Sequence, residues 1–234
     1  ASARTWEQEN FPAILNVWFG GCESGDAICD VLFGDKVPSG KLTATMPKSV
    51  GQIPLYYNHL NTGRPLKEGK WFSKFTSNYL DIDNDPLYPF GYGLSYTTFK
   101  YGKPTLSSNT MTNNETISVS VDITNTGNYD ADEIAQMYIR DLAASVSRPV
   151  KELKGFERIS IKKGETKTVT FTITPEDLKF YNQELEYKNE PGEFEVNEKT
   201  LCSLESLLEN YVAYHVAKQL KSFAFIRQMS NCPP

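Results

Sequence analysis

Alternation of apolar and polar residues constrains the fold of this 234-residue chain more than any other feature. Because the side chains of a strand point alternately to its two faces, a period of two predicts strands with one buried and one exposed face. The alternating runs, the second of them looser, are residues 117–123, 133–140 and 166–174. Turn formers separate them at Asn125-Thr-Gly127, Lys163-Gly164 and Pro191-Gly192. The pattern predicts a mainly β chain with an antiparallel sandwich over residues 97–196.

The first 48 residues predict a strand followed by a helix. Residues 13–19 are apolar without alternation, as in a strand that is buried on both faces of a parallel sheet. Apolar residues at helical spacing predict a helix over residues 23–33 that ends at Gly34. One such unit cannot cover both faces of a parallel strand, so we expect this block to need a partner from outside the 234 residues.

Two segments flank the predicted sandwich. Residues 49–96 are rich in aromatic and turn-forming residues with little periodicity, which predicts a linker that packs against another surface. Residues 203–223 carry apolar side chains at helical spacing and predict a helical tail over 197–234, where a sandwich normally ends on a strand. Within the sandwich, the segment that begins at Pro175 predicts a short helical turn.

Composition excludes several classes of function. The chain has 24 Lys and Arg against 29 Asp and Glu, a net charge of −5, unlike the basic surface of a nucleic-acid-binding protein. No apolar run approaches the length of about 20 residues that a membrane-spanning helix needs. Residues 1–10 show no signal-peptide core. We expect neither a nucleic-acid partner nor a membrane span.

The cysteines and the acidic residues do not predict a metal site. Cys22 and Cys29 lie about 10 Å apart on the predicted helix, too far for a disulfide, so we expect buried free thiols. Cys202 and Cys232 meet only if the tail folds back. Zinc is not expected, because the chain has two histidines and no Cys-x-x-Cys motif. Residues 81–85 resemble a calcium loop only superficially, since the required Gly and Glu are replaced by Pro86 and Tyr92.

Several collinear motifs resemble the C-terminal part of a glycoside hydrolase family 3 enzyme of the β-glucosidase type. They extend over residues 4–196 and include Trp6-Glu-Gln-Glu-Asn-Phe-Pro-Ala-Ile-Leu15, Trp18-Phe-Gly-Gly-Cys-Glu-Ser-Gly-Asp-Ala-Ile28, Gly51-Gln-Ile-Pro-Leu-Tyr-Tyr-Asn-His59, Asn61-Thr-Gly-Arg-Pro65, Pro86-Leu-Tyr-Pro-Phe-Gly-Tyr-Gly-Leu-Ser-Tyr96 and Arg148-Pro-Val-Lys-Glu-Leu-Lys-Gly-Phe156. The resemblance implies four parts: the end of an α/β sandwich domain (1–48), an interdomain linker (49–96), a fibronectin type III-like domain (97–196) and an atypical helical tail (197–234).

The resemblance also implies an activity, the hydrolysis of β-glycosidic bonds by a retaining, exo-acting glycosidase of carbohydrate metabolism. A retaining mechanism needs two carboxyl groups about 5–5.5 Å apart. In the family the nucleophile lies on a TIM-type barrel and the acid/base usually on an upstream part of the α/β domain. The nucleophile's segment has no counterpart here, and the acid/base segment of the family generally lies upstream of the motif at Gly20 and is not assigned. We therefore expect no catalytic residue in this chain and no cofactor. Its β-glycoside substrate would be bound through the missing barrel and α/β domains, in the periplasm or outside the cell.

Four residues are candidates for positions beside the substrate: Glu23, His59, Arg64 and Trp71. Glu23 opens the predicted helix, where the helix dipole favours a negative charge; alternatively it only caps and orients the loop. His59 and Arg64 lie in the linker, where each could bond a sugar hydroxyl, a neighbouring carboxylate or the linker itself. Trp71 offers an apolar face either for sugar stacking or for interdomain packing.

The sequence departs from the family pattern after Val196. Residues 221–225 are a candidate for a displaced last strand of the sandwich, with the helix as an insertion. The whole tail could equally come from a frameshift, a fusion or a misassembled gene. For the chain as a whole, the alternatives to part of a hydrolase are a stand-alone binding or adhesion module for glycans or a partner protein, and a gene remnant.

Overall fold

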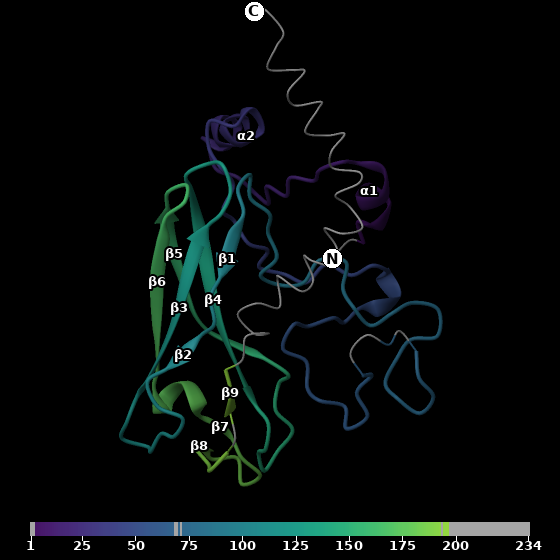
Figure 1. Cartoon of the computed structure of the whole chain (residues 1–234). Helices are drawn as coiled ribbons and strands as arrows, with labels where there is room; N and C mark the ends of the chain where they lie inside the picture. Colours follow the sequence, from purple (N-terminus) through teal and green to yellow (C-terminus); the bar gives the residue numbers. More distant parts are fainter. Residues whose placement is uncertain (1–2, 68–69, 71, 193, 197–234) are drawn as a thin grey trace, which may run out of the picture.

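The computed structural model describes residues 3–67, 70, 72–192 and 194–196 (Figure 1). The predictions for Trp71, Cys202, Cys232 and the tail 197–234 lie outside this part of the chain. No helix among the described residues is long and apolar enough to cross a membrane.

The sandwich consists of two antiparallel sheets, as the alternation predicts (Figure 1). In the first sheet, the central strand pairs with two short strands on one edge and a long strand on the other: β1 (Phe99–Tyr101), β2 (Thr105–Leu106), β3 (Ile117–Asn125) and β6 (Thr166–Ile173), with β3 central. The second sheet has β4 at its centre: β5 (Glu152–Ile161), β4 (Ala131–Asp141) and β9 (Phe194–Glu195). The strands β7 (Phe180–Tyr181) and β8 (Tyr187–Lys188) form a separate hairpin.

The core lies between the facing sides of the two sheets. Alternate residues of each long strand supply it, because these side chains share one face of the pleat. The core includes Val119, Val121 and Ile123 of β3, Ala135, Met137 and Ile139 of β4, and Val169, Phe171 and Ile173 of β6. The turn predicted at Pro175 is the short 3-10 helix η2 (Pro175–Leu178), which has a capping box between Thr174 and Asp177.

Gly127 is required where the chain turns from β3 to β4. A Cβ atom added there would lie 2.1 Å from the Thr97 hydroxyl and 2.5 Å from the Thr98 nitrogen. The buried Asn125 side chain fixes the same turn, because its Oδ1 accepts from the Thr97 hydroxyl and from the Gly127 nitrogen. The two strands therefore meet at a turn with no space for a side chain.

We expect Gly127→Ala to lower the free energy of unfolding by about 1–3 kcal/mol, the usual cost of overpacking a tight site. Urea denaturation measures the change. Gly21→Ala is the matched control, because nothing lies within 4 Å of a Cβ atom at that position. Equal stability of the two variants would contradict the prediction.

The N-terminal block contains the predicted helix and lacks the predicted strand. The helix α2 (Ser24–Phe33) ends at Gly34, which adopts φ 86° in the left-handed region. A short additional helix, α1 (Thr5–Asn10), precedes it. Residues 13–19 form no strand, and all of them are exposed. The prediction of a buried strand is wrong for this chain, because a parallel strand needs hydrogen-bonded neighbours and covering helices that the described residues do not provide.

The thiols of Cys22 and Cys29 are free, as their spacing predicts, but both are exposed. Their predicted burial is wrong, since α2 has no buried residue. The helix is contacted by Tyr96, whose hydroxyl donates to the Val31 carbonyl, but both thiols are left exposed.

Candidate functional site

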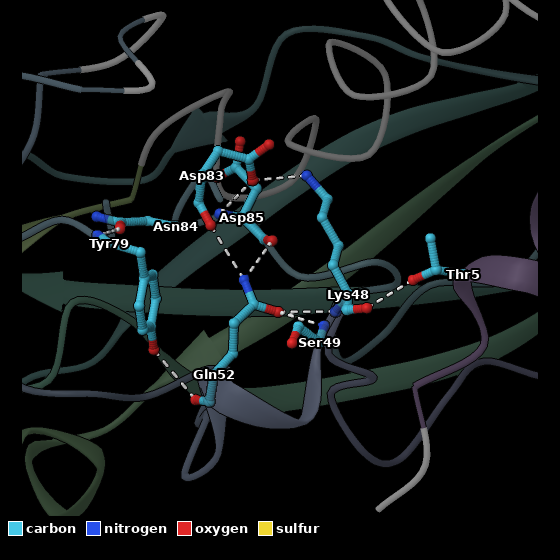
Figure 2. A network of polar contacts seen from close by, with 8 residues as sticks. All are labelled: Thr5, Lys48, Ser49, Gln52, Tyr79, Asp83, Asn84 and Asp85. Atoms are coloured by element: carbon cyan, nitrogen blue, oxygen red, sulfur yellow. Dashed lines mark hydrogen bonds and ion pairs between the residues drawn. The ribbon is translucent and has the colours of Figure 1, made fainter. Parts of the chain in front are cut away.

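A polar network centred on Gln52 joins the start of the linker to residues 79–85 (Figure 2). Gln52 ends the 3-10 helix η1 (Val50–Gln52), and it is 1% exposed. Its Oε1 accepts from the backbone nitrogens of Lys48 and Ser49 at 2.7 and 3.3 Å. Its Nε2 donates to the carbonyl oxygens of Asp83 and Asp85 at 3.1 and 3.2 Å. One buried amide thus holds together two segments that lie more than 30 residues apart in the sequence.

The same network extends to α1 and to the acidic residues Asp83 and Asp85. Lys48 Nζ pairs with Asp83 Oδ1 at 2.6 Å, and the Lys48 carbonyl accepts from the Thr5 hydroxyl at 2.6 Å. The Tyr79 hydroxyl donates to the Gln52 carbonyl at 3.2 Å. Asp83 is therefore engaged by a cation and by the backbone nitrogen of Asp85. Among the described residues, no group of three or more His, Cys, Asp or Glu side chains is arranged to hold a metal ion.

Aromatic residues attach the linker to the outer face of β4. Tyr57 stacks on Phe90 with ring centroids 4.2 Å apart, and its edge contacts the ring of Tyr138 at 6.1 Å. Gln136 Nε2 donates to the Gly91 carbonyl at 3.4 Å. Gly91 adopts φ 82°, and a Cβ atom there would lie 2.3 Å from Gln136 Oε1. Tyr57 and Phe90 thus pack this part of the linker against the sandwich.

A buried ion pair joins the N-terminal block to the sandwich. Lys41 Nζ lies 3.1 Å from Glu133 Oε2, and the two side chains are 10% and 6% exposed. The Tyr101 hydroxyl donates to Glu133 Oε1 at 2.9 Å, and Lys41 Nζ also donates to the Gly93 carbonyl at 3.3 Å. Both charged groups are therefore hydrogen-bonded as well as paired, which is the condition under which buried charges are tolerated.

The structure places three of the four predicted site residues on the surface. Glu23 is exposed at the start of α2, and its side chain makes no capping hydrogen bond. The exposed His59 has its Nδ1 3.1 Å from the Leu60 carbonyl, and its own carbonyl accepts from the Val150 nitrogen. Arg64 is exposed, and its carbonyl accepts from the Ser77 nitrogen. In the described part of the chain, no hydrogen bond or ion pair joins Glu23, His59 and Arg64 to one another, so their roles stay predictions.

A groove of about 430 Å³ is lined by the linker residues that lie between His59 and Arg64 in the sequence. Its walls are linker residues Asn61, Thr62 and Gly63 and the turn between β4 and β5. Two buried charges lie at its edge, Asp141 and Arg148, with side chains 2% and 11% exposed and Nε 3.7 Å from Oδ2. Burial raises the pKa of the Asp141 carboxyl, against the opposing effects of the Ala143 amide and the Arg148 cation.

Arg148 organises the turn beside this groove. It donates to Glu152 Oε1 at 2.8 Å, and its guanidinium lies 4.3 Å from the centroid of the Phe180 ring. Sequence reasoning recognised Arg148 as part of a motif but gave it no role. One sequence signal could have identified this cluster. An arginine, Arg148, lies between two acids, Asp141 and Glu152, in the segment that follows the alternating run 133–140.

Exposed apolar side chains gather in the block that contains α2. Phe19 is fully exposed, and Trp18, Leu32 and Phe33 are between 52% and 75% exposed. Several neighbours in the segment 11–19 are also more than 40% exposed: Phe11, Ile14, Leu15 and Val17. So many exposed apolar residues within one block are typical of an interaction surface.

Comparisons with known proteins match both halves of the chain. A family model described as the glycosyl hydrolase family 3 C-terminal domain matches residues 2–96, and one described as a fibronectin type III-like domain matches residues 133–197. A periplasmic beta-glucosidase of Salmonella typhimurium is 57% identical over 190 residues, 81% of this chain and 25% of that protein. A beta-xylosidase of Formosa agariphila is 47% identical over 189 residues, with the same coverage.

A solved structure is also similar. The beta-glucosidase from Listeria innocua in complex with glucose has a TM-score of 0.71 and 46% identity, over 75% of this chain and 24% of that one. The chain therefore spans about a quarter of the length of the relatives that it matches.

Proposed function

Because the chain belongs to glycoside hydrolase family 3, of which it carries the C-terminal domain and the fibronectin type III-like domain, we propose that it is the C-terminal part of a retaining, exo-acting hydrolase of β-glycosidic bonds. The remaining three quarters of such an enzyme supply the barrel, the rest of the α/β domain and the pair of catalytic carboxyl groups. The enzyme acts on β-glucosides or β-xylosides in the periplasm or outside the cell. The name of the Salmonella relative supports that location.

The exposed apolar segment 11–19 is the observation that carries this proposal. In an isolated module these side chains would be left in water, whereas in a complete α/β domain they would form a strand covered on both faces. The ion pair of Lys41 and the linker contacts then hold the sandwich against that domain. His59 and Arg64 belong to a linker that is firmly attached to the sandwich, and we propose that they approach the substrate or a neighbouring carboxylate from there.

The proposal predicts that the purified 234-residue chain does not hydrolyse aryl β-glucosides or aryl β-xylosides. Activity is expected only after the chain is mixed with the complementary portion of a relative, such as the Salmonella protein without its matched region. Association is measured by analytical ultracentrifugation and turnover by release of the aryl group. The double variant Trp18→Glu/Phe19→Glu should lose both association and turnover, because it places charges on the surface to be covered.

Phe156→Glu is the matched control, because Phe156 is 72% exposed on β5, outside the apolar segment. This variant should associate and turn over like the parent chain. Turnover by the 234-residue chain alone that Glu23→Gln abolishes would contradict the proposal and make Glu23 catalytic in its own right.

A further inference from the structure

Two tyrosines stand together on the hairpin of β7 and β8, at the end of the sandwich opposite α2 (Figure 1). Tyr181 and Tyr187 are cross-strand partners, and their ring centroids lie 5.0 Å apart with an interplanar angle of 44°. They are 65% and 55% exposed, and Leu185 in the turn between them is 80% exposed. Single exposed aromatic residues are common on protein surfaces, but a contacting pair forms one continuous apolar surface.

Other residues hold this hairpin in place. Asn182 is 3% exposed, and its Oδ1 accepts from the nitrogens of Glu184 and Glu186 at 3.1 and 2.9 Å. Its Nδ2 donates to Glu190 Oε1 at 3.0 Å. The adjacent Phe180 is buried beneath the Arg148 guanidinium, and Gln183 Nε2 donates to the Ser145 carbonyl at 2.8 Å. The tyrosine rings are thus presented by a rigid support, so little conformational entropy is lost when a ligand covers them.

The tyrosine pair by itself is too small to form a stable protein interface. A fully buried tyrosine covers about 150–250 Å², so the exposed parts of Tyr181 and Tyr187 offer roughly 200–300 Å². A stable protein interface covers about 800 Å² on each partner. The available area is instead comparable to that of one or two sugar rings.

The charges around the pair favour a neutral ligand. Hydrogen bonds from Lys188 to Glu186 and from Ser145 and Asn182 to Glu190 lower the pKa of both carboxyl groups, so both are negative at neutral pH. Lys188 Nζ lies 2.6 Å from Glu186 Oε2 and is therefore already paired. Nucleic acids and other polyanions are disfavoured by this rim, whereas carboxylates accept hydrogen bonds from hydroxyl groups.

We propose that Tyr181 and Tyr187 form a stacking platform for a neutral β-glucan chain. In a β-1,4-linked glucan both the hydroxyl groups and the glycosidic bonds are equatorial, so the chain is extended and its axial C–H groups give flat apolar faces that match a tyrosine ring. The tyrosine hydroxyls and the rim carboxylates then bond the hydroxyl groups at the ring edges. The platform does not depend on the activity proposed above.

Titration of the 234-residue chain with cellohexaose, followed by isothermal calorimetry or NMR chemical shifts, tests the platform. Saturable binding is expected for the parent chain. The double variant Tyr181→Ala/Tyr187→Ala should bind at least tenfold more weakly, and Tyr181→Phe/Tyr187→Phe should stay within about threefold of the parent, because the stacking faces remain. Tyr129→Ala is the matched control, since Tyr129 is 54% exposed in the turn between β3 and β4.

The proposal would be overturned by no saturable binding by the parent chain, by equal binding by the double alanine variant, or by equal affinity for the α-linked maltohexaose. A phenylalanine variant as weak as the alanine variant would also overturn it, because hydroxyl bonding would then replace stacking. Thermal melting of each variant shows whether the fold is kept. Since the titration needs no turnover, a negative result in the complementation experiment leaves this one fully interpretable.

Discussion

Replacement of Lys41 by methionine should lower the free energy of unfolding by about 3–5 kcal/mol, the usual cost of removing one partner from a buried ion pair. Methionine keeps an unbranched side chain in the space but leaves the Glu133 carboxylate, which is 6% exposed, without its cation. The Tyr101 hydroxyl would remain as a hydrogen-bond donor and cannot neutralise the charge. Urea denaturation should therefore show a lower midpoint concentration of urea. The m-value should be unchanged, because the same surface is exposed on unfolding.

The matched control is Lys167→Met, which removes an exposed lysine 3.9 Å from the Glu165 carboxylate. Exposed pairs contribute about 0–1 kcal/mol, so this variant should be close to the parent in stability. The double variant Lys41→Met/Glu133→Leu should recover much of the loss, because neither charge is then buried. A loss below about 1 kcal/mol for Lys41→Met would show that Glu133 finds another partner or reaches water.

Gln52→Ala should have the second large effect, about 2–4 kcal/mol, confined to the linker. The change removes four hydrogen bonds at once, and backbone groups left unsatisfied in a buried setting cost about 1–3 kcal/mol each before water reaches them. Water can replace part of these hydrogen bonds, because neighbouring residues of the network are partly exposed. Hydrogen exchange should show loss of protection at residues 48–52 and 83–85, with β3 and β4 protected as in the parent.

Gln183→Ala serves as the control for this experiment, because its side chain donates a single bond, to the Ser145 carbonyl. That variant should differ from the parent by less than about 1 kcal/mol. Uniform loss of protection over the sandwich in Gln52→Ala would contradict the expectation, since it would mean that linker and sandwich unfold as one cooperative unit.

The alternation of apolar and polar residues predicted the sandwich because the pleat imposes its period directly on the sequence. The helix α2 was predicted for a similar reason, since its apolar spacing and the glycine after it are local signals. Residues 13–19 were misassigned because burial depends on neighbours, and a sequence pattern states only which environment a segment would suit. The burial of Cys22 and Cys29 was mispredicted for the same reason, since the described residues leave both thiols exposed.

The contacts that hold the linker could not be predicted from local patterns. Gln52 bonds to residues 31 and 33 positions away, and Lys41 pairs with a residue 92 positions away. Nothing in the spacing of these residues indicates their partners. The roles of Glu23, His59 and Arg64 stay predictions, because the groups they would serve lie outside the residues that the structure describes.

The attachment of Lys41 to Glu133 has a mechanical consequence for the N-terminal block. This ion pair and the contact of Tyr57 with Tyr138 fasten the linker to the sandwich, and the Gln52 network holds the linker segments to one another. The Thr5 hydroxyl of α1 donates to the Lys48 carbonyl, and the Tyr96 hydroxyl donates to the Val31 carbonyl of α2. Both helices of the N-terminal block are therefore tied to the segment that the sandwich holds, so a rotation of the block relative to the sandwich must first break these bonds.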